Sequence, residues 1–143
     1  YGSTIDWTSS NGEMIHTIKY AESKDCKKWK FFGTCIPYEL GKAQAFSKPS
    51  VIKNNDGYHM WFSYRGGNGV PYRIGYAHSQ NGHDWKMQQS NLTVSNKGWD
   101  SEMVCYPFIF KHKNKLFMLY NGNRYGINGF GLAEASLGKN NVT

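Results

Sequence analysis

Two segments of the chain repeat one another at a fixed spacing. The sequence TIKYAESKDCKKW at residues 17–29 aligns without a gap with RIGYAHSQNGHDW at residues 73–85, which begins 56 residues later. A third copy starts with GFGLAEAS at residues 129–136, but no tryptophan follows it. A constant spacing of this kind predicts repeated structural units, each of which buries its apolar faces against its neighbours.

An aromatic segment recurs as well. Residues 105–123, CYPFIFKHKNKLFMLYNGN, are similar to residues 48–66, KPSVIKNNDGYHMWFSYRG. Pro107 follows Pro49 by 58 residues. Two separate halves of one unit therefore repeat, which an immunoglobulin-like sandwich has no reason to do.

The complete unit lies between Ser47 and Trp85. Apolar or aromatic runs alternate there with turns rich in Asn and Gly, which predicts four short antiparallel strands. We expect strands at Pro49–Ile52, Tyr58–Tyr64 and Tyr72–Ser79 and a closing strand from Trp85. The predicted fold class is therefore all-β, a partial β-propeller of about two to two and a half four-stranded antiparallel blades.

The repeats also set the expected boundaries within a single partial-propeller domain, residues 1–143. Residues 1–46 are predicted to form an incomplete blade, residues 47–92 a complete blade and residues 99–138 a second incomplete blade. The segment Tyr1–Asp6 is a candidate for an additional strand. Because 16% of residues are aromatic and 16 are Gly, we expect strands and turns and almost no helix.

Cysteine and histidine usage favours neither a disulfide framework nor a metal site. The three cysteines have no CxxC spacing, and the five histidines are scattered without metal-ligand spacing. We therefore expect no cofactor and no metal. Free thiols suit a reducing compartment, and no secretory segment or membrane span is visible, so a cytoplasmic location is favoured.

The formal net charge of +7 comes largely from lysines in or beside predicted turns. Charge in such places is usually solvated. Polyanion binding, to nucleic acid or to an acidic glycan, is the alternative, because a basic surface attracts polyanions without any special fold. No nucleic-acid motif is present, so we do not expect a nucleic-acid partner.

The repeated element Tyr-Ala-x-Ser-x-Asp/Asn-x-x-x-Trp resembles five-bladed β-propellers of the glycoside hydrolase family 43 and family 32 superfamily. GWDSEMVCYPFIF at residues 98–110, followed by LFMLYNGNRYGINGFGLA at residues 116–133, resembles a bacterial group of glycosidase-like propellers linked to surface-polysaccharide loci. The resemblance covers most of the chain. It implies a carbohydrate ligand and cleavage of a sugar bond by two carboxylates that come from different blades and face a central pocket.

The positions that the resemblance assigns to these carboxylates lie just before a proline on the innermost strands. Here they read Ser47-Lys48-Pro49 and Cys105-Tyr106-Pro107, so Lys48 stands where an Asp is expected and Cys105 where a Glu is expected. This departure favours a non-catalytic binding or assembly module derived from a glycosidase propeller. Whether the chain is an enzyme stays open at this point.

Asp100 and Glu102 are the best acidic candidates for catalysis. They lie shortly before Cys105, and two residues at this spacing fall on the same side of an extended chain. If the site is partly dry, one carboxyl can have a raised pKa and the other an ordinary one. A solvated loop with a turn-forming Asp is the alternative.

Five further residues are candidates for substrate binding. Aromatic rings offer flat faces to sugar rings, and arginines near strand ends can clamp a carboxylate or phosphate through two hydrogen bonds. The alternatives are aromatic residues of the core and ordinary surface arginines. The candidates are Arg65, Trp99, Tyr106, Arg124 and Tyr125.

Two to two and a half blades cannot close a propeller, which needs at least four to remove its exposed edges. Either the missing blades belong to a longer protein, or the open faces are buried by self-association. We favour a homodimer, because a two-fold interface satisfies both copies equally. The leading functional hypothesis is carbohydrate recognition, with hydrolysis of a glycosidic bond as an open possibility.

Overall fold

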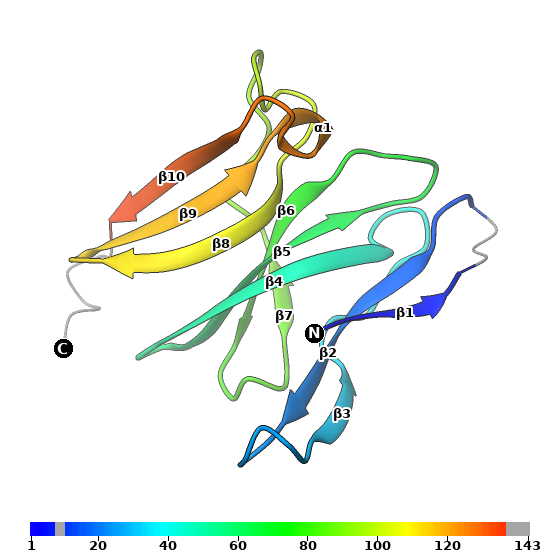
Figure 1. Ribbon diagram of the computed structural model, residues 1–143, viewed down its shortest axis with the longest axis vertical. Helices are drawn as coiled ribbons and strands as arrows, with labels where there is room; N and C mark the ends of the chain where they lie inside the picture. Colours follow the sequence, from blue (N-terminus) through cyan, green and yellow to red (C-terminus); the bar gives the residue numbers. More distant parts are fainter. Residues whose placement is uncertain (8–10, 137–143) are drawn as a thin grey trace.

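The computed structural model describes residues 1–7 and 11–136, and strands dominate them (Figure 1). The helix α1, Asn123–Gly126, is one turn long, and two of its residues have left-handed backbone angles. The strands are β1 (Gly2–Asp6), β2 (Ile15–Glu22), β3 (Lys30–Thr34), β4 (Ala45–Asn54), β5 (Gly57–Arg65), β6 (Arg73–Ser79), β7 (Lys86–Gln88), β8 (Cys105–His112), β9 (Lys115–Asn121) and β10 (Phe130–Ser136).

The strands form a seven-stranded sheet, β1 to β7, and a three-stranded sheet, β8 to β10; we divide the larger sheet into two antiparallel groups, so that three groups lie side by side (Figure 1). In the middle group, β4, β5, β6 and β7 pair in chain order. In the last group, β9 lies between β8 and β10. In the first group, β2 lies between β1 and β3, and it also touches β4 through a single parallel pair, His16 with Ala45.

The predicted fold class is confirmed: the chain is all-β, with sheets of the kind that make up a partial β-propeller. The strand expected at the start of the chain is present as β1. The division into blades at 1–46, 47–92 and 99–138 stays a prediction, and residues 137 and 138 lie outside the described part of the chain.

The sequence repeat corresponds to a repeated turn held by a side chain. In each copy one oxygen, Oδ1 of Asp25 or of Asn81, accepts hydrogen bonds from the backbone N–H groups two and three residues ahead, at 2.8–2.9 Å. The next residue is Cys26 in one copy and Gly82 in the other, with φ of 57° and 81°. Cys26 therefore adopts the left-handed conformation that glycine prefers, and its turn has the same hydrogen bonds as the turn at Gly82.

Apolar residues of β5 contribute to two separate cores. Met60 and Phe62 belong to a buried cluster with Ile18 and Ile36 of the first group, whereas Trp61, between them, packs against a cluster shared with the last group. Successive side chains of a strand point to opposite faces, so β5 is covered on both sides. This explains why its sequence alternates imperfectly between apolar and polar residues.

The first strands of the middle and last groups, β4 and β8, begin with the same backbone irregularity. The pairing register shifts across Lys48 in β4 and across Tyr106 in β8, and each of these residues directly precedes a proline. Lys48 has φ of 51° and Tyr106 has φ of 59°, values that are uncommon outside glycine. Strained backbone of this kind clusters at functional sites, so the starts of β4 and β8 are candidates for a functional site.

The side chain of Ser63 in β5 joins the middle and last groups at this irregularity. Its Oγ accepts a hydrogen bond of 2.6 Å from the backbone N–H of Tyr106, and the residue is fully buried. We predict that Ser63→Ala lowers the free energy of unfolding by about 1–3 kcal/mol, because a buried N–H loses its acceptor. Urea unfolding of this variant beside the exposed Ser95→Ala measures the difference; equal stability of the two variants would contradict the assignment.

Candidate functional site

A depression of about 520 Å³ lies where the first and middle strand groups and β8 meet. The early residues of β1, one histidine of β2, the start of β4 and two tyrosines form its wall. These lining residues are Gly2, Ser3, Thr4, His16, Phe46, Ser47, Lys48, Pro49, Tyr72 and Tyr106. The depression therefore lies at the irregular starts of β4 and β8.

Arg65, at the end of β5, lies beside this depression and links several segments. Its Nη2 forms an ion pair of 2.6 Å with Oε2 of Glu13, which is only 7% exposed. Its guanidinium lies 4.7 Å from the ring centre of Tyr72, and its Nη1 donates a hydrogen bond of 3.3 Å to the hydroxyl of Tyr125. Its Nε is buried without a hydrogen-bond partner among the described residues.

Three tyrosines from distant parts of the chain surround Arg65. The rings of Tyr106 and Tyr125 stack at 6.1 Å with an angle of 24° between planes, and Tyr72 lies 6.0 Å and 6.2 Å from these two rings. We refer to Arg65, Tyr72, Tyr106 and Tyr125 as the Arg–Tyr cluster. It brings together three of the predicted binding residues, namely Arg65, Tyr106 and Tyr125.

The hydroxyls of Tyr72 and Tyr106 stay neutral at ordinary pH. Burial raises the pKa of Tyr72, against an opposing effect of the nearby Arg65 charge. Burial also raises the pKa of Tyr106. Neutral phenols can donate and accept hydrogen bonds while their rings present apolar faces. Tyr125 is 46% exposed, so the cluster has an accessible aromatic edge.

The other two predicted binding residues lie elsewhere. Trp99 packs against Tyr120 with ring centres 5.4 Å apart. Its indole also covers Gly122 and Gly131, where an added methyl group would collide with it, so Trp99 supports the last strand group. Arg124 is exposed and has φ of 52° in α1. In the part of the chain that the structure describes, neither has a hydrogen bond or ring contact with the Arg–Tyr cluster.

Asp100 and Glu102 differ sharply in their surroundings. Asp100 is 6% exposed, and its Oδ2 accepts a hydrogen bond of 3.0 Å from the hydroxyl of Tyr120, whose pKa burial and this hydrogen bond raise to about 12. The side chain of Glu102 is exposed. The expectation that the two share one side of an extended chain is wrong, because Ser101 N–H bonds the carbonyl of Gly98 in a turn.

The two positions where the resemblance expects carboxylates contain Lys48 and Cys105. Lys48 is exposed and lines the depression. Cys105 is fully buried, and burial raises the pKa of its thiol to about 11. Within the described ranges, Glu13 is the carboxylate that contacts the Arg–Tyr cluster. The sequence analysis missed Glu13, because only the fold brings it to the end of β5; its place just before the apolar strand β2 was the available signal.

A second group of polar side chains gathers far from the depression, at the turn between β4 and β5. Asp56, His59 and His78 place one ligand atom each within 4.8 Å of one another. The expectation of no metal rests on sequence spacing, which does not reveal that His59 and His78 are paired across two strands. These residues have the chemistry of metal ligands.

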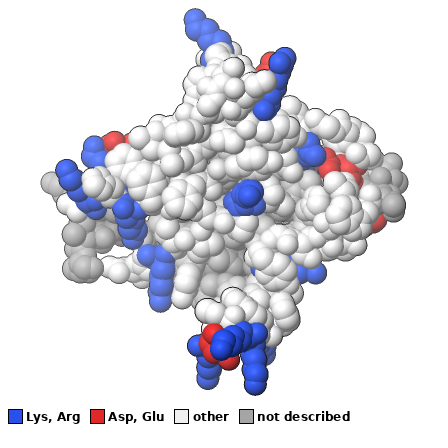
Figure 2. All heavy atoms as spheres, in the orientation of Figure 1, with Lys and Arg blue, Asp and Glu red and all other residues white. Residues whose placement is uncertain are grey.

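The positive charge does not form one continuous patch on the face seen in Figure 2, where Lys and Arg lie in separate groups, several of them on projecting ends. Solvated charge in turns is consistent with this distribution. Among the described residues no helix has the length and apolarity needed to cross a membrane.

Two curated proteins of Mycobacterium tuberculosis are similar to this chain in sequence. They are "Uncharacterized protein MT1551" of strain CDC 1551 and "Uncharacterized protein Rv1502" of strain H37Rv, each 38% identical over 136 residues. The match covers 93% of this chain but 44% of each relative, so the chain spans less than half the length of the relatives it matches. No family model matches the sequence.

Two solved structures have a similar fold. One, a "Glycoside hydrolase", superposes with a TM-score of 0.69 at 18% identity, and the match covers 94% of this chain and 39% of the hydrolase. The other, a complex of BT0996 and RGII, gives a TM-score of 0.70 at 17% identity, and the match covers 100% of this chain and 41% of that protein. At such low identity the likeness establishes the fold alone: the chain has a glycosidase-like fold.

The burial of Cys105 has a direct chemical consequence. Alkylation requires a thiolate, and a buried thiol with a pKa of about 11 supplies almost none near neutral pH. We predict that iodoacetamide at about pH 8 modifies the exposed Cys26 of the folded protein long before Cys105. Peptide mass spectrometry over time distinguishes the two sites, with urea-unfolded protein as the control; equal rates in the folded state would contradict the placement.

Proposed function

We propose that this chain binds carbohydrate at the Arg–Tyr cluster, as part of a five-bladed propeller of the glycoside hydrolase family 43 and 32 type. The observation that supports this most is the convergence of three tyrosines and a partly buried arginine beside a depression at the starts of β4 and β8. The resemblance to glycosidase-like propellers implies a sugar pocket at the starts of these strands. The glycosidase-like fold is consistent with the proposal.

The chemistry of the cluster suits a sugar. The accessible face of Tyr125 and the stacked ring of Tyr106 offer apolar surface to the C–H groups of a pyranose ring. Arg65 is fixed by Glu13, so its donors are positioned before a ligand arrives. Lys48 adds a positive charge to the depression, which favours a sugar that has a carboxylate or phosphate group.

Binding without hydrolysis is the form of this proposal that the site residues favour. Hydrolysis needs two carboxylates across the sugar bond, whereas Lys48 and Cys105 occupy the expected positions. Glu13, the acidic residue of the cluster, is already committed to Arg65. Catalysis by Asp100 and Glu102 is the second candidate, and Trp99 and Arg124 are then the substrate-binding residues beside them.

The proposed binding predicts a specific pattern of variants. Tyr106→Ala and Tyr125→Ala each weaken binding to an oligosaccharide identified on an array of neutral and acidic glycans by about tenfold, because each removes an aromatic face. The exposed Tyr38→Ala is the matched control and leaves binding unchanged. Calorimetric titration measures the affinities.

Two outcomes contradict parts of the proposal. If both tyrosine variants bind as tightly as the unaltered protein, the Arg–Tyr cluster is not the sugar site. If the unaltered protein cleaves aryl glycosides and Asp100→Asn or Glu102→Gln abolishes the turnover, hydrolysis replaces simple binding. Binding without turnover in the unaltered protein supports the non-catalytic module.

The open faces of the outer strand groups are proposed to pack against a second copy of the chain. Large apolar side chains are exposed on β3 and β10, including Phe31 at 68% and Phe130 at 70%. Apolar rows of this kind mark interfaces.

Self-association is tested by size-exclusion chromatography with light scattering. We predict a mass of twice the 16.3 kDa of one chain at micromolar concentration. Leu132→Lys on β10 shifts the protein toward monomer, because a charge enters the apolar face, whereas Val70→Lys in an exposed loop is the matched control and does not. An unaltered protein that stays monomeric at this concentration would contradict the dimer.

A further inference from the structure

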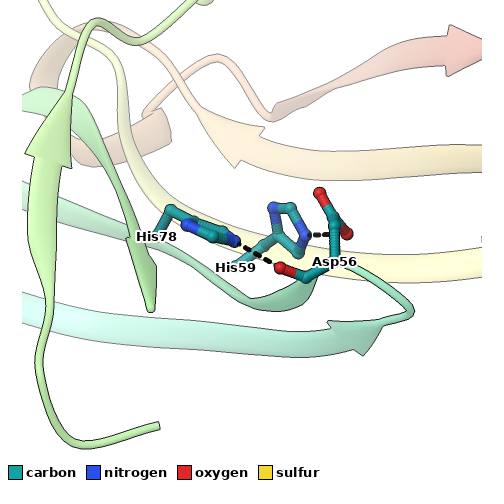
Figure 3. A group of neighbouring side chains, drawn as sticks. All are labelled: Asp56, His59 and His78. Carbon is teal, nitrogen blue, oxygen red and sulfur yellow. Dashed lines mark hydrogen bonds and ion pairs between the residues drawn. The ribbon is translucent and has the colours of Figure 1, made fainter. Parts of the chain in front are cut away.

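Three potential metal ligands converge at the turn that connects β4 to β5, and Figure 3 shows their side chains pointing toward one another. Asp56 belongs to the turn, His59 to β5 and His78 to β6. His59 and His78 are directly opposite each other in the antiparallel register. The group lies at the far end of β4 from Lys48 and is thus separate from the proposed sugar site.

His59 is the most buried of the three. It is 9% exposed, its Nε2 lies 3.0 Å from Oδ1 of Asp56, and its Nδ1 lies 2.7 Å from the hydroxyl of Tyr76. Two ligand atoms on one tetrahedral zinc ion, each at about 2.0–2.1 Å, lie close to 3.3 Å apart, so the Asp56–His59 spacing is near that of a ligand pair. The hydroxyl of Tyr76 can accept a hydrogen bond from the Nδ1–H group of His59, and Nε2 is then unprotonated and free to bind a metal.

His78 can turn to the metal without leaving a buried group unsatisfied. Its Nε2 is 2.9 Å from the backbone carbonyl of Asp56, and the same carbonyl accepts a hydrogen bond of 3.0 Å from Nε2 of Gln80. If the imidazole of His78 rotates to bring a nitrogen to the ion, Gln80 keeps the carbonyl hydrogen-bonded. The rings of His59 and His78 are already 5.0 Å apart.

The fold itself does not require histidines at these positions. In the last strand group Met118 pairs with Ala133, as Met60 pairs with Ala77 in the middle group. The neighbouring pair is Phe117 with Glu134 there, where the middle group has His59 with His78. The repeated strand pair thus forms with an aromatic ring and a carboxylate, so packing alone does not explain two imidazoles.

We propose that Asp56, His59 and His78 bind one divalent transition-metal ion of the zinc class. The three side chains supply a carboxylate oxygen and two imidazole nitrogens, a ligand set common in zinc sites, and the 56% exposure of the Asp56 side chain leaves the fourth position open to water. The ion fastens the β4–β5 turn to β6. Tyr76 orients His59 from behind.

Zinc chloride titrated into the whole chain, followed by calorimetry, tests the site. We expect one ion per chain, with affinity lowered at least about tenfold in His59→Gln and in His78→Gln. His83→Gln is the matched control, because His83 is an exposed histidine of the same strand group outside the cluster, and it retains the affinity. Tyr76→Phe weakens binding while keeping all three ligands.

The unaltered protein gives an independent measurement if a variant fails to fold. In nitrogen-15 NMR spectra, zinc shifts the imidazole signals of His59 and His78 and leaves those of His16 and His112 in place. Zinc that shifts all histidines alike, zinc that binds folded His59→Gln and His78→Gln as tightly as the unaltered chain, or no binding at all would overturn the proposal.

Discussion

The structure depends on the requirement that a β-sheet with two apolar faces be covered on both. β5 shows this most clearly, since Met60 and Phe62 pack toward the first strand group and Trp61 toward the last. The middle group cannot bury its apolar surface without both neighbours. The outer groups do not meet this requirement. Among the described residues no further sheet covers them, and Phe31 and Phe130 are exposed there.

The functional geometry follows from this side-by-side arrangement. Residues that meet at the Arg–Tyr cluster come from the end of β5, the loop before β6, the start of β8 and the segment after β9. Each is fixed by its own strand group, and the packing between groups brings them together. Ser63 contributes directly, because it binds the backbone of Tyr106 across the boundary between two groups.

Much of the fold could be predicted from the sequence because its determinants are local. The fixed repeat spacing and the alternation of apolar runs with turns rich in Asn and Gly indicated the strands. The candidate site was harder to predict from the sequence, because its residues are far apart in the chain. Glu13 and Arg65 meet only through tertiary packing. The prediction that the side chains of Asp100 and Glu102 point the same way assumed an extended chain, whereas the segment forms a turn. His59 and His78 likewise become neighbours only through strand register.

The left-handed backbone at Lys48 bears on which side chain suits this position. Aspartate tolerates such a conformation better than lysine does, because its short side chain can bond to nearby backbone groups. The bend before Pro49 is therefore a conformation that an aspartate would adopt at lower cost than the lysine that this chain has. Lys48 thus keeps its place in the wall of the depression against the conformational preference of its own backbone.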